Sequence, residues 1–318
     1  MKPSICSSLL AFVVLVSCTN SNDFLLNTAV PSNLEESLTI KRLEQLNDSI
    51  IQNNTPCIVS RSWENNLFIT AADAYGAYKY GRRGAQIGSW TGTPHGTTVG
   101  AIIGGTFGAI KYSYRAYEKT KLEEDSKKAN LKLYKITNAY CSLYRIDTSN
   151  FDYCLDFLKD KEFENAGEYH NRAISYLLDY NGYEISLLRD GNEIDTPAPD
   201  PIDPENYIEL TPLERSIVEN EDFSFVLDAD ETIFQISSAD DFEFDNSTCG
   251  AVMQLYIDAI RLYNGYEAIR DVISLTNEYI DIVHNSSELT ESEKENLYIA
   301  FSVGAYSYKY WSELFNKQ

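Results

Sequence analysis

The residues with the clearest chemical potential lie on one predicted helix, residues 161–180. This segment contains Gly167-Glu168-Tyr169-His170-Asn171, which places a histidine near a carboxylate. A histidine can act as a general base or bind a metal, and Glu168 or Glu164 could assist it. A single histidine on a mostly apolar helix face is usually a hydrogen-bonded structural residue. The sequence therefore leaves two interpretations of His170, a hydrolase-type site with Glu168 and a structural role.

Other patterns associated with catalysis or cofactor binding are missing from the sequence. It has no Gly-rich phosphate loop, nucleophile elbow, paired-histidine motif or dinucleotide fingerprint. The acidic stretches 228–231 and 240–245 suggest calcium, but neither forms a twelve-residue loop with a central glycine and a final glutamate. No Cys-x-x-Cys pair supports a zinc or redox site. We therefore predict no cofactor and no metal, and we expect the acidic stretches to be exposed loops.

A row of glycines dominates the segment 71–117, around which the predicted fold is organised. Seven glycines follow one another at a spacing of four, namely Gly84, Gly88, Gly92, Gly96, Gly100, Gly104 and Gly108. Residues four apart share a helix face, and glycine lets a neighbouring backbone approach closely. Pro94 interrupts the row and predicts a turn. We therefore predict a packed helical hairpin with arms near 68–90 and 97–118.

A membrane-inserting hairpin is the alternative interpretation of this segment. Residues 85–110 carry no formal charge, but the apolar part of the second arm, 97–110, is short for a bilayer. The first arm also carries Asp73 and Lys79 together with two arginines, which hydrocarbon disfavours. The glycine pattern resembles the glycine-zipper hairpins of some bacterial envelope lipoproteins. Both the packed and the membrane-active interpretation remain open at this stage.

The amino terminus predicts a secreted, lipid-anchored protein. Lys2 precedes an apolar run at 9–16, which together indicate a signal peptide over residues 1–17. The ending Leu15-Val16-Ser17-Cys18 resembles the lipobox of bacterial lipoproteins. This resemblance implies cleavage before Cys18, a diacylglycerol on its thiol and, because Thr19 follows, retention in the outer membrane. Residues 18–33 are expected to form a tether between this membrane anchor and the folded part.

Further short motifs resemble uncharacterised Bacteroidetes lipoproteins. They are the Gly-x-x-His-Asn pattern at 167–171 and the stretch 302–311, and they imply no activity. The triplet Asp48-Ser49-Ile50 matches the O-glycosylation sequon of Bacteroidetes, so Ser49 is either glycosylated or part of a solvated helix end. In an oxidising compartment the remaining cysteines could form two disulfides or stay as buried thiols. These cysteines are Cys57, Cys141, Cys154 and Cys249.

The composition restricts the partners of the chain. The formal net charge is −22, and loss of Lys2 with the leader makes it more negative, so binding to nucleic acid or anionic headgroups is not expected. The 23 tyrosines suit recognition of protein or carbohydrate, or packing beside small residues. We therefore predict a structural role or the binding of a protein or glycan partner. The alternatives are a membrane-active protein that uses the glycine-rich hairpin and a hydrolase with a site at Glu168 and His170.

The predicted fold class is mainly α, a helical bundle organised around the glycine-rich hairpin. A first helical region, 34–190, precedes a Pro-rich acidic linker at 191–207, and a second region covers 208–318. Capping boxes at Thr211 and Thr290 mark helix starts. Small residues in the last helix predict that it packs back on the hairpin. The expected helices are 34–53, the two hairpin arms, 119–146, 149–160, 161–180, a short one after 211, 248–263, 266–285 and 290–316, with a weak strand signal at 223–236.

Overall fold

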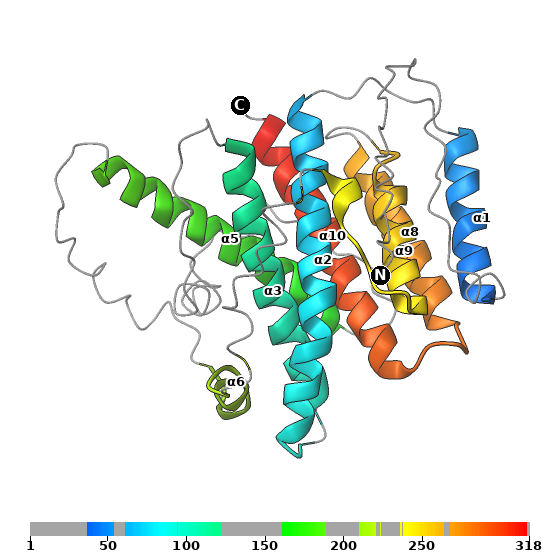
Figure 1. Ribbon diagram of the computed structural model, residues 1–318, viewed down its shortest axis with the longest axis horizontal. Coiled ribbons are helices and arrows are strands. Elements are labelled where there is room, and N and C mark those ends of the chain that lie inside the picture. The colour runs from blue at the N-terminus through cyan, green and yellow to red at the C-terminus, as the bar shows by residue number, and fades with distance from the viewer. Residues whose placement is uncertain are drawn as a thin grey trace, which may run out of the picture.

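The computed structural model describes a molecule built from helices (Figure 1). The residues described are 37–53, 61–93, 95–121, 161–188, 210–220, 223, 236, 238–263 and 268–316. The α-helices are α1 (Leu38–Asn53), α2 (Arg61–Trp90), α3 (Gly96–Lys121), α5 (Lys161–Leu188), α6 (Pro212–Val218), α8 (Thr248–Ile260), α9 (Ile269–His284) and α10 (Glu291–Asn316), and a 3₁₀ turn η5 covers Ala239–Asp241. These residues contain no strand, and the mainly α fold class is confirmed.

Helices α2 and α3 form an antiparallel hairpin. The observed helices are longer than the arms expected from the glycine spacing, since α2 begins at Arg61 and α3 ends at Lys121. The connection contains Gly92, whose φ of +67° lies in the left-handed region that favours glycine. An added Cβ at Gly92 would have no heavy atom within 4 Å. The expectation that Gly92 packs against the other arm is therefore wrong, because it forms the turn instead.

Glycines lie where the backbones of α2 and α3 approach each other. A Cβ added at Gly84 would lie only 2.0 Å from the carbonyl oxygen of Gly100, and one at Gly104 would lie 2.5 Å from the Tyr80 carbonyl oxygen. Real Cβ contacts are never this short, so alanine at these positions requires a shift of backbone. The facing glycine pairs are Gly76 with Gly108, Gly84 with Gly100, and Gly88 with Gly96.

A repeated tract, Gly-Ala-x-Lys-Tyr, occurs once on each arm and pairs with itself across the hairpin. The Nζ of Lys79 on α2 donates to the Tyr112 hydroxyl of α3 at 3.4 Å. The Nζ of Lys111 on α3 donates to the Tyr80 hydroxyl of α2 at 3.0 Å. The two bonds are related by a local twofold arrangement centred on the Gly76–Gly108 contact, so the repeat serves the pairing of the arms.

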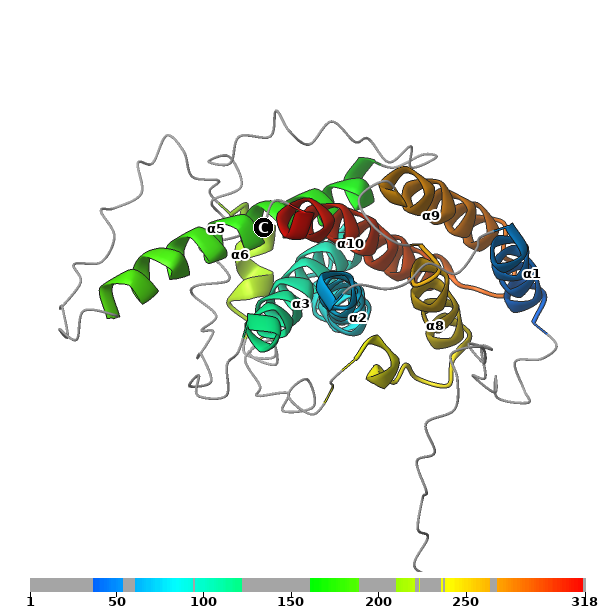
Figure 2. The same cartoon turned by 90° about the horizontal axis from the view of Figure 1, so that it is seen from above.

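Helix α10 lies in the middle of the bundle and contacts α2, α3, α5, α8 and α9 (Figure 2). Its start is fixed by a capping box, in which Thr290 and Glu293 exchange hydrogen bonds between side chain and backbone. On α5, a Cβ at Gly167 would lie 2.6 Å from the carbonyl oxygen of Ser302 on α10, so these helices also pack closely. Nearly all of the described buried apolar side chains form one continuous core that extends from α1 to α10. Helices on both sides of residues 189–209 therefore share a core.

No helix in the described part of the chain is long and apolar enough to cross a bilayer.

Several expectations fall outside the described residues. They include the leader, Cys18 and the tether, most of the predicted helices 119–146 and 149–160, the linker 191–207, and nearly all of the weak strand 223–236. Ser49 is described and lies exposed on α1, where its Oγ donates to the Leu46 carbonyl oxygen at 2.7 Å. The capping box at Thr211 is present at the start of α6.

Candidate functional site

A carboxyl group on α2 lies where four helices meet. The Oδ2 of Asp73 accepts hydrogen bonds from Ser113 Oγ on α3 at 3.0 Å, and from two α10 side chains, Ser307 Oγ at 2.6 Å and Trp311 Nε1 at 3.1 Å. The Nε2 of His170 on α5 lies 3.4 Å from the same oxygen. All five residues are buried, and Asp73 and His170 are 0% exposed. We call these residues, with Asn171, the buried cluster.

The hydrogen bonds of Asn171 assign the tautomer of His170. The Nδ2 of Asn171 donates to the Tyr306 carbonyl oxygen at 2.8 Å, and its Oδ1 lies 3.0 Å from Nδ1 of His170. An amide oxygen only accepts hydrogen bonds, so the proton of a neutral imidazole belongs on Nδ1. Nε2 then holds a lone pair beside the carboxyl group of Asp73. Because a lone pair beside an ionised carboxylate is unfavourable, this contact favours the protonated form of Asp73.

Burial shifts both groups of this pair toward their neutral forms. It raises the pKa of Asp73 to about 8, against the opposing effect of the hydrogen bonds from Ser307, Trp311 and Ser113. It lowers the pKa of His170 to about 4, although the hydrogen bond with Asn171 acts in the other direction. Near pH 7 the pair is therefore a carboxylic acid beside a neutral imidazole.

Glu168 does not take part in the buried cluster. Its carboxylate pairs with Arg172, one turn further along α5, whereas His170 lies against Asp73. Residues two apart point to different sides of a helix, so closeness in sequence does not bring Glu168 and His170 together. A catalytic base must also reach its substrate, and a fully buried imidazole does not. The structure thus corrects the expected Glu168–His170 site, and the side chain of Glu164 lies outside the described residues.

Cys249 on α8 is a free thiol, 3% exposed. Burial and the nearby charge of Glu293 raise the pKa of this thiol to about 12. Of the two alternatives for Cys249, a disulfide or a buried thiol, the structure shows the buried thiol. The other three cysteines, Cys57, Cys141 and Cys154, lie outside the described residues.

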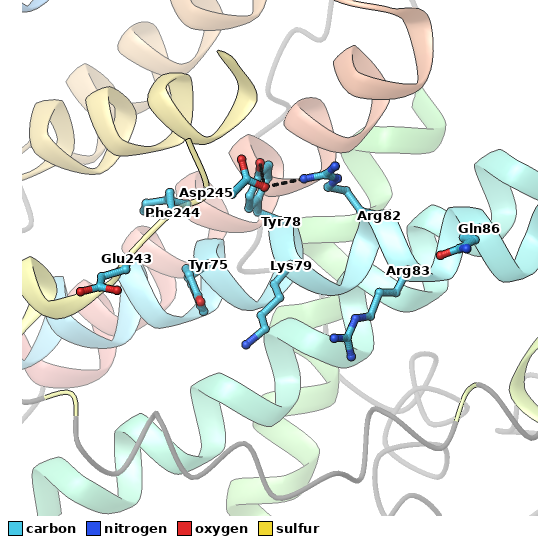
Figure 3. Close-up of a pocket in the computed structure, with 9 residues that line it drawn as sticks. All are labelled: Tyr75, Tyr78, Lys79, Arg82, Arg83, Gln86, Glu243, Phe244 and Asp245. Atoms are coloured by element: carbon cyan, nitrogen blue, oxygen red, sulfur yellow. Dashed lines mark hydrogen bonds and ion pairs between the residues drawn. The ribbon is translucent and has the colours of Figure 1, made fainter. Parts of the chain in front are cut away.

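An open pocket of about 590 Å³ lies on a different face of α2 (Figure 3). Residues four apart share a helix face, so its lining from α2 forms two rows. The rows are Tyr75, Lys79 and Arg83, and Tyr78, Arg82 and Gln86. Glu243, Phe244 and Asp245, in the segment that leads into α8, complete the lining. We call these nine residues the α2 pocket.

The carboxylate of Asp245 is fixed between α2 and the start of α8. Its Oδ2 accepts hydrogen bonds from Arg82 at 2.5 Å and from the Tyr78 hydroxyl at 3.1 Å, and its Oδ1 accepts one from the Ser247 amide at 3.1 Å. Ser247 is the N-cap of α8 and accepts a hydrogen bond from the Gly250 amide. Partial burial alone would raise the pKa of Asp245, but the bonds from Ser247 and the charge of Arg82 outweigh it and lower the pKa. Asp245 is therefore ionised at neutral pH.

Aromatic rings set the position of the cations in the α2 pocket. The ring of Phe244 packs against Tyr75 and Tyr78, with centroids 5.2 and 5.7 Å away. The Nζ of Lys79 lies 5.5 Å from the centre of the Tyr75 ring, and the guanidinium of Arg83 lies 5.8 Å from that of Tyr80. The rings and these two cations of the α2 pocket are therefore in contact with one another without a ligand.

Sequence reasoning singled out His170 and the stretch that contains Asp245, but it did not predict which residues they lie against. Asp73 is a single carboxylate within the alanine-rich run 71–74, which is unusual for a solvated helix face. The pocket rows are visible as two sets of residues at a spacing of four. Nothing near Asp245 in the sequence indicates that it pairs with Arg82, because the two residues are 163 positions apart.

Within the described ranges, no group of three or more His, Cys, Asp and Glu side chains is placed to hold a metal ion. The acidic stretch 240–245 contributes Glu243 and Asp245 to the α2 pocket instead. No protein-family model matches the chain, and comparison with curated proteins and with solved structures gives no match.

Proposed function

We propose that this protein is a lipid-anchored protein of the bacterial outer membrane whose helical body binds a protein or glycan partner at the α2 pocket. The observation that carries the binding role is the α2 pocket itself. It combines aromatic rings, three cations and two carboxylates in one open site, and contacts between α2 and the segment before α8 position Phe244 and Asp245. Preorganised polar and aromatic groups in an open pocket are typical of binding sites.

The amino-terminal sequence supports the anchor. The apolar run 9–16 and the lipobox-like ending at Cys18 direct the chain to lipidation, and the polar residues 18–33 separate the anchor from α1. The acidity of the chain supports a protein or glycan partner in preference to nucleic acid.

The interior of the bundle supports a binding role in preference to the two alternatives. The glycines of α2 and α3 contact each other, so this packing already accounts for their spacing. Asp73 and His170 in the buried cluster are fully enclosed, so a substrate in solution cannot touch them. Neither feature calls for a membrane-active hairpin or a hydrolase.

A binding experiment tests this function. Full-length mature protein, purified in mild detergent, is applied to arrays of glycans and of peptides, together with Arg83→Glu in the pocket and Arg270→Glu on the exposed face of α9 as a charge-matched control. We expect binding to one class of arrayed ligand, its loss in Arg83→Glu and its retention in Arg270→Glu. Absence of binding, or equal loss in both variants, would contradict the proposal.

The anchor is tested separately on cells. Mass spectrometry of the mature amino terminus should find a diacylglycerol on Cys18, and Cys18→Ala should leave the outer-membrane fraction. A Cys18→Ala protein that stays with the outer membrane would contradict the anchoring part of the proposal.

A further inference from the structure

We infer that the connected end of the α2–α3 hairpin rests among the headgroups of the bilayer to which the chain is anchored, with Trp90 as its contact residue. This inference rests on the proposed lipid anchor and adds a second contact with the same membrane. It depends on the exposure of Trp90, on the lack of charge around it and on the place where the chain enters the fold. We call residues 86–93 and 95–98 the hairpin tip.

Trp90 is the last residue of α2 and exposes a large apolar ring. Its exposed fraction is 56%, whereas Trp63 and Trp311 are 5% and 0% exposed. Tryptophan combines an apolar body with an N–H donor, and it is enriched at membrane interfaces, where one side is apolar and the other is wet. Most of this ring is therefore available to a surface outside the bundle.

The hairpin tip carries no formal charge. The nearest charged residues along the two arms are Arg83 and Lys111, in a chain of net charge −22. Two hydroxyls of the tip already have acceptors within it, since Ser89 Oγ donates to the Gln86 carbonyl oxygen at 2.6 Å and Thr91 Oγ1 donates to that of Gly88 at 2.7 Å. The tip can therefore leave bulk water without desolvating a charge of its own, and these two hydrogen bonds are kept.

A neighbouring carboxylate limits the depth of the contact. The Oε2 of Glu295 on α10 accepts a hydrogen bond from Thr98 Oγ1 at 3.4 Å, so a negative charge lies beside the α3 side of the tip. A charged side chain is costly in hydrocarbon, so only the outermost turn of the hairpin reaches the headgroups. This shallow contact differs from a membrane-active hairpin, in which both arms would enter the bilayer.

The chain that leads from the anchor enters the fold at the same end of the bundle as the hairpin tip. The amide of Leu38, at the start of α1, donates to Oε1 of Glu288 in the connection between α9 and α10 at 2.8 Å. The first turns of α10 also contact the tip, through Glu295 and Thr98. Figure 1 shows the start of α1 and the connected end of the hairpin both directed toward the lower side of the molecule.

The length of the intervening chain keeps this end near the membrane. Residues 19–36 separate Cys18 from the described part, and 18 residues reach at most about 60 Å. Leu38, which is 54% exposed, shares this end of the bundle with Trp90, whereas Ile51, which is 40% exposed, lies at the other end of α1. An anchor at Cys18 therefore places two exposed apolar side chains toward the bilayer.

Quenching of tryptophan fluorescence by brominated lipid tests the contact. The protein is the full-length mature chain, held by its own lipid in phosphatidylcholine vesicles, with or without bromine atoms on the acyl chains close to the headgroups. Brominated vesicles should reduce the emission of Trp90. Trp90→Phe should remove this loss, because Trp63 and Trp311 are buried. The matched control is Ile51→Trp in the Trp90→Phe background, which places an exposed tryptophan at the other end of α1 and should show no loss.

Flotation of the vesicles separates failure of this inference from failure of the proposed anchor. A chain that floats with the vesicles and shows no quenching of Trp90 would overturn the hairpin contact alone. Equal quenching in the wild type and in the Ile51→Trp control would also overturn it, since the bundle would then have no preferred side toward the membrane. Leakage of a dye enclosed in the vesicles would contradict a contact confined to the headgroups. A chain that does not float would contradict the anchor and this inference together.

Discussion

Two polar residues on α2, Asp73 and Arg82, differ in their burial and in the charge that they carry near neutral pH. Asp73 and Arg82 are nine residues apart on α2, yet Asp73 is 0% exposed while the side chain of Arg82 is 52% exposed. Burial by α3, α5 and α10 makes the neutral form of Asp73 the stable one near pH 7. Partial solvation and a carboxylate partner keep Arg82 and Asp245 charged. The charge of a side chain here depends on which elements cover its face of the helix.

The comparison also separates stability from function along α2. The face toward α3 and α10 carries glycines and Asp73 and serves packing. The face with the two pocket rows is mixed, because Tyr78 and Lys79 also take part in packing, whereas Arg82, Arg83 and Gln86 are exposed. We therefore expect substitutions on the first face to change stability and substitutions at the exposed positions of the second to change binding.

The largest effect is expected from Asp73→Ala. The substitution leaves Ser113, Ser307 and Trp311 without their shared buried acceptor, and each lost partner is costly, so the free energy of unfolding should fall by about 4 kcal/mol. Urea unfolding measures this loss. The control is Glu243→Ala at an exposed position of the α2 pocket, with an expected change of less than about 0.5 kcal/mol. Similar losses in both variants would remove the contrast between the two faces.

A large effect is also expected where α2 meets α3. Gly84→Ala places a methyl group 2.0 Å from the Gly100 carbonyl oxygen, and the neighbouring atoms are backbone that cannot rotate away. We expect a loss of about 3 kcal/mol, at the upper end of the cost of overpacking. The matched control on the open face is Gln86→Ala, which should be neutral in thermal unfolding. If Gly84→Ala unfolds at the same temperature as the wild type, α2 and α3 can move apart at this contact without loss of stability, which would contradict the prediction.

The buried cluster predicts a specific dependence of stability on pH. Between about pH 4 and 6.5 the folded chain binds one proton at Asp73, and the unfolded chain binds one at His170. The two states bind equal numbers of protons at this pair, so its contribution to stability does not change with pH in this range. Above pH 6.5 only the folded chain holds its extra proton, because the pKa of Asp73 is raised to about 8. Its stability should therefore fall as pH rises from 6.5 to 8, by up to about 2 kcal/mol.

Urea midpoints of the wild type and of Asp73→Asn, measured from pH 5 to 9, check this dependence. The variant lacks the titrating carboxyl, so the decline above pH 6.5 should disappear and only the histidine contribution should remain below it. Parallel profiles for the two proteins would show that Asp73 does not titrate in this range.

The smallest effect is expected from the ion pair of the α2 pocket. The Nη1 of Arg82 and the Oδ2 of Asp245 are 2.5 Å apart, but about half of each side chain is exposed, so solvent screens their attraction. A double-mutant cycle with Arg82→Gln and Asp245→Asn should give a coupling of about 0.5 kcal/mol that shrinks in high salt. A coupling as large as the loss in Asp73→Ala would show that the pocket, too, supports the core.

Local patterns were sufficient to predict most helices. The glycine spacing and Pro94 predicted both arms of the hairpin, and the capping boxes at Thr211 and Thr290 predicted two helix starts. These signals act within a few residues, and tertiary packing agrees with them. The exception is Gly92, which has the spacing of the row but the backbone conformation of the turn.

The sites were harder to predict because their members are distant in sequence. Ser307 lies 234 residues from Asp73, and no periodicity relates them. The sequence suggested Glu168 as the partner of His170 because the two are close in the chain, but helix geometry turns them to different sides. The buried cluster depends on how four helices meet, and only the tertiary structure shows that.

The position of α10 has a consequence for folding kinetics. The hairpin of α2 and α3 has a short connection, so it can form within about microseconds, whereas α10 contacts partners such as Tyr78 from a distance of 218 residues. Until α5 and α10 dock, Asp73 faces water and is ionised near neutral pH. Docking must then take up a proton at Asp73. The late step of folding should therefore slow as the solution becomes more alkaline, while hairpin formation should not.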